Sequence, residues 1–483
     1  MNLLAVQRVL GLLLMVFSLA MLPPAAVSWL YSDGEFDTFL KGFVVVFAIG
    51  GLVWFPVRRR HRDLRRRDGA LIVALFWSVL GTAGAVPLLL TSSTSLPVTD
   101  AVFVSVAALT TTGADLIVGL DVLPESILFY RQWLQWLGGM GIIVLAVAIL
   151  PLLGVGGMQL YRAETPGPTK DTKLTPRITE TAKTLWTIYL LFTVACAIAY
   201  RIAGMGWFDA VSHSFSTVSL GGLSTHDLGI GYFDSAGIEI VTVVFMILGG
   251  ANFALHFQAF HRGTLKHYWR DTEFRTYVLL LFWLAVFVSV YLLVADYQDD
   301  RGTPIRSAVF HAVSIMTTTG FVSGNFSDWP GMLPVLLILS SFVGACAYST
   351  GGGMKVIRWV LLTKQGVREV RRLVHPRAQF AAKMGSRAVP EKVVSAVWGF
   401  FSVYVVVFAV LMIVTMALGL DHVTAFSAVA ACLNNLGPGL GDVATNYASI
   451  PAATKWVLML AMLLGRLEIF TLLILFTPAF WKK

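Results

Sequence analysis

Four stretches of the chain share a fourteen-residue pattern that ends on a glycine. They read DAVFVSVAALTTTG (100–113), DAVSHSFSTVSLGG (209–222), SAVFHAVSIMTTTG (307–320) and TAFSAVAACLNNLG (424–437). The closing turns carry no ionisable side chain, so the chemistry open to them uses backbone carbonyl oxygens, which can replace the hydration shell of an ion. A terminal glycine lets several chains approach closely. The pattern therefore predicts a site for a dehydrated monovalent cation, and the absence of carboxylates in the turns disfavours divalent ions.

The elements that position these turns must lie in a membrane. Hydrophobic residues make up 57% of the chain, charged residues 13%, and the mean hydropathy is +0.75, which is too little charge for a soluble domain. The sequence predicts ten apolar spans, near 3–30, 38–57, 70–90, 126–153, 184–204, 234–260, 275–295, 331–362, 392–418 and 452–480.

Charge fixes an expected orientation. Lysine and arginine concentrate in 58–67, 154–183, 261–275, 363–392 and at Lys482–Lys483, and the positive-inside rule makes these segments cytoplasmic. With an even number of spans, both termini face the cytoplasm and the four glycine turns face the outside. The outer loops are rich in aspartate and glutamate, and such a field concentrates cations at a pore mouth. A plainer interpretation, that these are solvated loop charges, stays open.

Each glycine-terminated segment lies between two apolar runs and is too short to cross a membrane. A helix of about 12 residues spans roughly 18 Å, little more than half of the hydrocarbon. Re-entrant backbone must be buried in protein or wetted by water, so the four segments are expected to face one another. One such turn alone is no more than a flexible connection, but four in register indicate a pore.

The expected fold is therefore an all-α integral membrane protein with four tandem span, pore-loop, span repeats around a pseudo-fourfold pore. Two extra N-terminal transmembrane helices precede the repeats. The expected boundaries are 1–67 for the N-terminal helices with a basic inner loop, then 68–182, 183–273, 274–389 and 390–483 for repeats 1 to 4.

These features resemble the TrkH/KtrB/HKT superfamily of K⁺ transporters over essentially the whole chain. The resemblance rests on the TTTG turns, the two extra N-terminal spans and the segment SSFVGACAYSTGGGMKVIRW at 340–359. The ten-span layout and long inner loops are most similar to the bacterial TrkH branch. The resemblance implies K⁺ uptake across the bacterial cytoplasmic membrane by a homodimer, with K⁺ as the only bound metal. It also implies gating by a cytosolic TrkA-like ring protein that binds NAD or ATP/ADP.

By this resemblance, the K⁺-lining carbonyls come from Thr111, Thr112, Leu220, Gly221, Thr318, Thr319, Asn435 and Leu436, with filter glycines at Gly113, Gly222, Gly320 and Gly437. A serine in place of the first glycine accompanies Na⁺ transport in plant relatives, so Gly113 favours K⁺. Loops 2 and 4 depart from TTTG, so the filter is only approximately fourfold and modest selectivity is expected.

The span after the third turn should be broken, because three consecutive glycines each disfavour a helix by about 1 kcal/mol. The resemblance makes this segment a gate beneath the filter, with gate residues Gly344, Ser349, Thr350, Gly351, Gly352, Gly353, Lys355 and Arg466. A helical kink packed by its neighbours is the competing interpretation.

Arg466 lies midway along the last apolar run. A lone arginine there must face water, carbonyls or an acid. We expect it to form a cationic barrier below the filter, and an interhelical salt bridge is the alternative. Lys355 could act likewise or extend toward the inner surface.

No enzyme motif is present, and this chain is expected to bind neither nucleotide nor nucleic acid itself. The main rival function is an H⁺- or Na⁺-coupled K⁺ symporter, for which Glu468 is the candidate carboxylate. A non-conducting receptor or scaffold is a third possibility. The basic inner loops fit either anionic membrane lipid or the ring protein.

Overall fold

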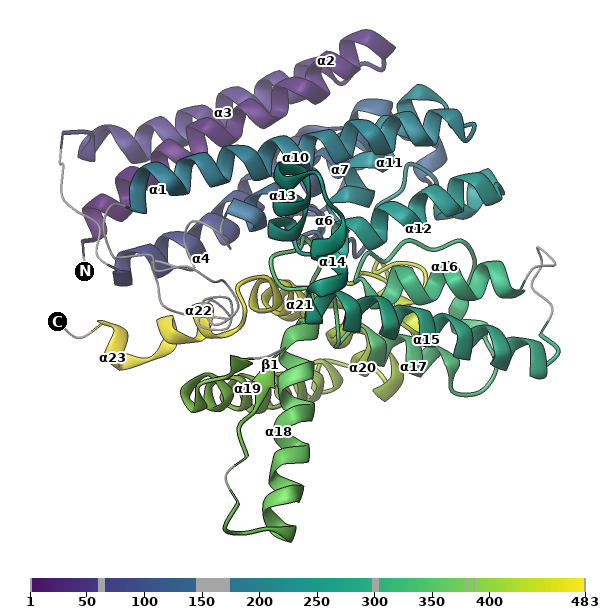
Figure 1. Cartoon of the computed structure of the whole chain (residues 1–483). Helices are drawn as coiled ribbons and strands as arrows, with labels where there is room; N and C mark the ends of the chain where they lie inside the picture. Colours follow the sequence, from purple (N-terminus) through teal and green to yellow (C-terminus); the bar gives the residue numbers. More distant parts are fainter. Residues whose placement is uncertain are drawn as a thin grey trace.

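The computed structural model describes residues 2–59, 66–144, 174–297, 304–378, 380–384 and 387–481. Most of the basic segments 58–67 and 154–183, and Lys482–Lys483, lie outside the described residues. The N-terminal part consists of α1 (Leu3–Ser18), η1 (Leu19–Met21), α2 (Leu22–Tyr31), α3 (Phe36–Trp54) and η2 (Phe55–Val57). Figure 1 shows α1 to α3 side by side along one flank of the molecule, with both chain ends at the same end of the helix bundle.

The remaining elements follow in chain order and are grouped by the four repeats that the sequence predicts, although α10 and α15 begin before the predicted boundaries at 183 and 274. The first contains α4 (Arg66–Ala83), α5 (Val86–Leu90), α6 (Val98–Leu109), η3 (Leu120–Val122) and α7 (Glu125–Val144). The second contains α10 (Leu174–Ile202), α11 (Trp207–Val218), η5 (Gly229–Phe233), α12 (Ala236–Gly250), α13 (Phe253–Arg262) and α14 (Lys266–Arg270). The third contains α15 (Thr272–Val294), α16 (Pro304–Met316), η6 (Phe326–Asp328), α17 (Leu333–Ser340), α18 (Val356–Val374), β1 (Lys383–Met384) and β2 (Arg387–Ala388). The fourth contains α19 (Glu391–Ala417), α20 (His422–Leu433), η7 (Gly441–Val443), α21 (Ala452–Arg466), α22 (Phe470–Leu473), η8 (Ile474–Phe476) and α23 (Pro478–Trp481).

The all-α class expected from the sequence is confirmed. Within the described residues the strands amount to one antiparallel pair, β1 with β2. Six described helical stretches are long and apolar enough to cross a membrane: 3–31, 36–57, 67–90, 182–202, 272–294 and 391–417. The apolar run at 331–362 is split into α17 and α18, as the glycines predict, and α18 projects away from the other helices (Figure 1).

Two further runs, which the sequence presented as continuous spans, are sharply bent. α12 and α13 meet at 96°, and α21 meets the segment from Phe470 to Phe476 at 110°. The first bend is stabilised because Asn252 caps α13 by accepting the Ala254 amide at 2.8 Å. At the second bend, Glu468 and Ile469 adopt positive φ angles of 53° and 51°. The sequence did not predict these bends within the expected spans at 234–260 and 452–480.

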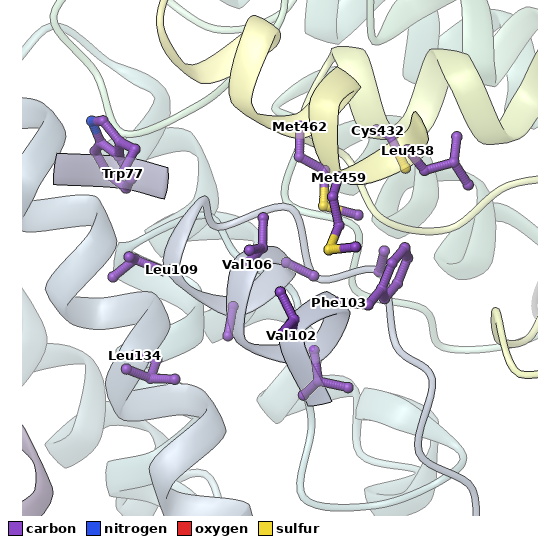
Figure 2. Close-up of a cluster of buried hydrophobic side chains, with 14 of the residues drawn as sticks. Trp77, Val102, Phe103, Val106, Leu109, Leu134, Cys432, Leu458, Met459 and Met462 are labelled. Atoms are coloured by element: carbon purple, nitrogen blue, oxygen red, sulfur yellow. The ribbon is translucent and has the colours of Figure 1, made fainter. Parts of the chain in front are cut away.

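The four short helices α6, α11, α16 and α20 have 12, 12, 13 and 12 residues. α6 is rich in β-branched residues, which are poor helix formers, so its stability must come from packing. Every residue from Ala101 to Leu109 is buried. Figure 2 shows Val102, Val106 and Leu109 of α6 in a cluster that also takes in Trp77 of α4, Leu134 of α7, and Met459 and Met462 of α21. Helices of repeats 1 and 4 thus hold this half-length helix inside the protein.

Candidate cation pathway

The turns that follow the four short helices form a closed ring. We call them loop 1 (110–113), loop 2 (219–222), loop 3 (317–320) and loop 4 (434–437). A Cβ atom added to the final glycine of each loop would collide with the backbone of the next loop. The colliding pairs are Gly113 with the Gly221 oxygen, Gly222 with the Thr319 oxygen, Gly320 with the Leu436 oxygen, and Gly437 with the Thr112 oxygen. Because the last pair returns to loop 1, the loops surround a single axis in chain order.

The four loops share one backbone conformation. Their second residues have positive φ, at 50° for Thr111, 56° for Leu220, 60° for Thr318 and 54° for Asn435, and their glycines have φ between 69° and 99°. The third residue, between them, is not in this region. Positive φ is unusual for β-branched residues and costs on the order of 1–3 kcal/mol each. The same strained position in all four loops indicates a shared functional geometry.

This conformation turns the amides away from the ring. The third residue of each loop donates its N–H back to a carbonyl of its own short helix: Thr112 to Ala107 at 2.8 Å, Gly221 to Ser216 at 2.8 Å, Thr319 to Ser314 at 2.9 Å and Leu436 to Ala431 at 2.7 Å. The residues at positions one to three of the loops are almost completely buried. The amides of these third residues are therefore satisfied by their own short helices.

A cavity of about 350 Å³ lies above the ring and is lined by all four terminal glycines. Carboxylates at this mouth have protein partners. Asp115 forms a salt bridge with the buried Arg131, and Asp227 accepts the amides of Gly119 and Leu120 at 3.1 Å. Arg131 therefore neutralises one charge of the acidic field expected from the sequence, and Asp227 joins loop segments of repeats 1 and 2.

His226 is a titratable contact at the same mouth. Its Nδ1 lies 2.5 Å from Asp121 and its Nε2 lies 3.5 Å from Asp209, while its ring stacks on Tyr232 with 3.5 Å between centroids. Burial by itself lowers the pKa of His226, but hydrogen bonds and charge from Asp209 and Asp121 outweigh burial and raise this pKa. The His226 ring thus bridges outer segments of repeats 1 and 2.

The triple-glycine segment, residues 344–353, lies directly against the ring. The Gly352 amide donates to the Thr318 hydroxyl at 2.6 Å, and the Gly353 amide donates to the Asn434 carbonyl at 3.0 Å. The Thr350 hydroxyl donates to the Val218 carbonyl at 3.1 Å. Three of the four loops or their helix ends therefore contact this segment.

Arg466 completes this set of contacts. Its Nη2 donates to the Thr111 hydroxyl at 2.6 Å and its Nη1 donates to the Thr350 carbonyl at 3.2 Å. Among the described residues, no carboxylate forms a salt bridge with Arg466, and its Nε has no hydrogen-bond partner. The guanidinium thus links loop 1 to the triple-glycine segment. It lines a cavity of about 50 Å³ together with Lys355, whose ammonium donates to the Gly351 carbonyl.

The remaining predicted gate residues lie within this segment. Gly344 has φ of 71° and Gly353 also has φ of 71°, which other residues rarely adopt. The Ser349 hydroxyl donates to the Cys346 carbonyl at 2.6 Å and closes a turn inside the segment. Glu468, the carboxylate that a coupled symporter would use, pairs with Arg358 at 2.6 Å rather than with Arg466.

Three supporting side chains were missed by the sequence analysis. Gln135 of α7 donates to the Gly221 carbonyl at 2.6 Å, and Tyr447 donates to the Gly437 carbonyl at 2.7 Å. Buried Glu273 accepts the amides of Ala347 at 2.7 Å and Ile357 at 3.2 Å, on either side of the three consecutive glycines. The polar pair Gln132 and Gln135, spaced three apart in an apolar run, was the one hint available.

Comparison with known proteins finds relatives that match almost the whole chain. The model of the TrkH family, described as cation transport protein, matches residues 36–483. The chain is 57% identical to the Trk system potassium uptake protein TrkH of Vibrio parahaemolyticus, over 99% of both chains, and 54% identical to that of Escherichia coli K12, over 99% of both. The crystal structure of the potassium transporter TrkH from Vibrio parahaemolyticus superimposes with a TM-score of 0.93 at 54% identity, covering 100% of each chain.

Proposed function

Because the chain belongs to the TrkH family of cation transport proteins, a family of transporters rather than enzymes, we propose that it takes up K⁺ through a gated, channel-like pore in the bacterial inner membrane. The ion passes between loops 1 to 4 and is coordinated by their backbone carbonyls. The lining residues are those expected from the sequence: Thr111, Thr112, Leu220, Gly221, Thr318, Thr319, Asn435 and Leu436, with the four terminal glycines.

One observation carries this proposal: the four terminal glycines contact the next loop in a cycle that closes on itself. A ring of backbone oxygens without ionisable side chains suits a dehydrated alkali cation. A methyl group at any of the four glycines would strike a neighbouring loop, so the loops pack backbone against backbone with no room for a side chain at these positions.

The triple-glycine segment and Arg466 form the gate of the proposed pore. Hydrogen bonds from Gly352, Gly353 and Thr350 hold the segment under the ring. Arg466 adds a positive charge one hydrogen bond below Thr111. Opening then requires the segment to break these hydrogen bonds. A movement of α18, which follows the segment directly in the chain, would pull it away from the ring.

In this proposal, a cytosolic ring protein that binds NAD or ATP/ADP moves α18. The transporter acts as a homodimer. Both chain termini and the basic inner segments lie on the cytoplasmic side. Support for the orientation comes from the charge bias of the inner segments and from the position of both chain ends at one end of the bundle (Figure 1). The repeat boundaries remain those proposed from the sequence, at 68–182, 183–273, 274–389 and 390–483.

The second candidate function is an H⁺- or Na⁺-coupled K⁺ symporter. Such a carrier needs a carboxylate that exchanges protons or ions near the pathway. Glu468 lines the inner cavity, but its pairing with Arg358 at 2.6 Å favours a fixed charge over an exchanging one.

Electrophysiology of the purified protein in bilayers separates the two functions. The pore predicts a current that reverses at the K⁺ equilibrium potential at every pH and Na⁺ concentration. A reversal potential that moves with the H⁺ or Na⁺ gradient would replace the pore by the symporter. Failure to restore growth at low K⁺ in uptake-deficient cells, together with the absence of current, would leave only a non-conducting role.

A further inference from the structure

Loops 1 and 3 are closed internally by pairs of threonine hydroxyls. Thr110 and Thr112 hydrogen-bond to each other at 2.8 Å, and Thr317 and Thr319 do so at 2.7 Å. Each pair joins the first and third residues of its loop and is buried. Loop 2 has Ser219 and a glycine at these positions, so it has no side chain at the third position to make such a bond.

Gln135 of α7 occupies the space of that missing side chain. A Cβ atom added to Gly221 would stand 2.5 Å from Oε1 and 2.6 Å from Nε2 of Gln135. The fully buried amide donates from Nε2 to the Gly221 carbonyl at 2.6 Å, and its Oε1 accepts the Leu223 amide at 3.3 Å. The glutamine therefore brackets the end of loop 2 from both sides of Gly222.

The peptide between Gly221 and Gly222 is where loop 2 most needs such support. Two adjacent glycines leave the backbone freer than any other residue pair, so this peptide can rotate at low cost. A carbonyl oxygen has two lone pairs, so the Gly221 oxygen can accept the glutamine amide and still present its second lone pair to an ion.

We propose that Gln135 of repeat 1 takes the place, in space, of the threonine side chain that loop 2 lacks, and that it is a specificity-determining positioning residue for the Gly221 carbonyl. This inference rests on the proposed function of the ring as a K⁺ filter. On this account, a side chain of repeat 1 supports the loop of repeat 2 within the same chain. The ring therefore stays ordered although the four loop sequences differ.

Gln132 provides a matched control on the same helix. It is equally buried and also donates its amide to the loop 2 segment, but to the Leu223 carbonyl at 3.1 Å, which lies beyond the ring. Gln135→Met and Gln132→Met therefore remove the same chemical group from neighbouring sites. Only Gln135→Met removes the side-chain donor from a carbonyl of the ring, that of Gly221.

The test measures rubidium uptake into proteoliposomes containing the full-length protein, competed by K⁺ or by Na⁺. The net worth of one hydrogen bond predicts that Gln135→Met lowers the preference for K⁺ over Na⁺ about fivefold. Gln132→Met should keep it within about twofold by the same reasoning. Gln135→Leu, which also lacks the N–H donor and carries no titratable group, should lose selectivity as Gln135→Met does and serves if the methionine variant does not fold.

A rescue experiment distinguishes positioning from simple stability. Gly221→Thr alone should disrupt loop 2, because its Cβ collides with Gln135. Combined with Gln135→Ala, the threonine has room to bond Ser219, and selectivity should return toward that of the unmodified protein. A double variant that melts normally but is no more selective than Gln135→Ala overturns the inference.

The outcomes separate this inference from the proposed function. If the unmodified protein discriminates K⁺ from Na⁺ and Gln135→Met discriminates equally well, the inference is wrong while the pore stands. If the unmodified protein carries no rubidium in any condition, the proposed pore falls and the role of Gln135 falls with it.

Discussion

Replacing Arg466 by methionine should speed K⁺ flux. The guanidinium hydrogen-bonds Thr111 of loop 1 and Thr350 of the triple-glycine segment at 2.6 and 3.2 Å, so it places a positive charge under the ring. Methionine has a similar length and fills the site without charge. The change removes both an electrostatic barrier and a contact that holds the segment in place.

The size of the effect follows from the geometry. One threonine side chain separates the guanidinium from the inner end of the ring, and a separation of roughly 6 Å between the charge and an ion there is assumed in Coulomb's law. At an effective dielectric constant of about 20, two unit charges at that separation repel by about 2.8 kcal/mol, or about a hundredfold in occupancy. Water in the inner cavity will reduce this figure, so an increase in flux of about tenfold or more is expected.

Rubidium uptake into proteoliposomes measures the change directly, with melting temperature and size-exclusion profile as checks on folding. Arg466→Lys is the matched control, since it keeps the charge but loses the fork that reaches Thr111 and Thr350 together. Flux should rise less for lysine than for methionine. Unchanged or lower flux in a well-folded Arg466→Met would refute the barrier, and equal increases in both variants would assign the effect to the lost contacts alone.

Three further outcomes are expected. Gly113→Ser should lower the preference for K⁺ over Na⁺ by about tenfold, because its Cβ strikes the Gly221 oxygen at the positive φ of 69°; an unchanged uptake ratio in a stable variant contradicts this. Glu273→Leu should raise resting flux about tenfold, because it removes the charged acceptor of the Ala347 and Ile357 amides. A lower resting flux in this variant would contradict a role of Glu273 in holding the gate closed. The pKa of His226 is raised in the folded protein, so its contribution to stability is complete below about pH 6.5 and is lost as pH rises through the folded-state pKa. The melting temperature of the unmodified protein should fall over this pH range, and that of His226→Gln should not. Parallel melting profiles of the two proteins would exclude a role for the histidine.

The sequence carried enough information for the class of fold and for the ring. Four in-register patterns too short to cross the membrane leave few arrangements other than mutual contact, since re-entrant backbone cannot face lipid. The break at 344–353 could likewise be predicted, because three consecutive glycines oppose helix formation locally.

The bends and the supporting side chains depended on tertiary contacts and were not predictable in the same way. The break between α12 and α13 is stabilised by backbone bonds to the triple-glycine segment, from Cys346 to Gly250 at 2.9 Å and from Phe253 to Tyr348 at 3.1 Å. Nothing near Asn252 in the sequence announces those partners. The same holds for Tyr447, which lies 10 residues beyond Gly437 along the chain and meets its carbonyl only in the folded protein.

The most direct test of the central claim is a diffraction experiment on crystals grown with rubidium, using its anomalous signal. The account predicts density on the axis of the ring, within coordination distance of carbonyl oxygens from all four loops and without an intervening shell of water. Rubidium found only in the outer cavity on carboxylates, or no ordered ion at the ring in crystals of an otherwise active protein, would contradict it.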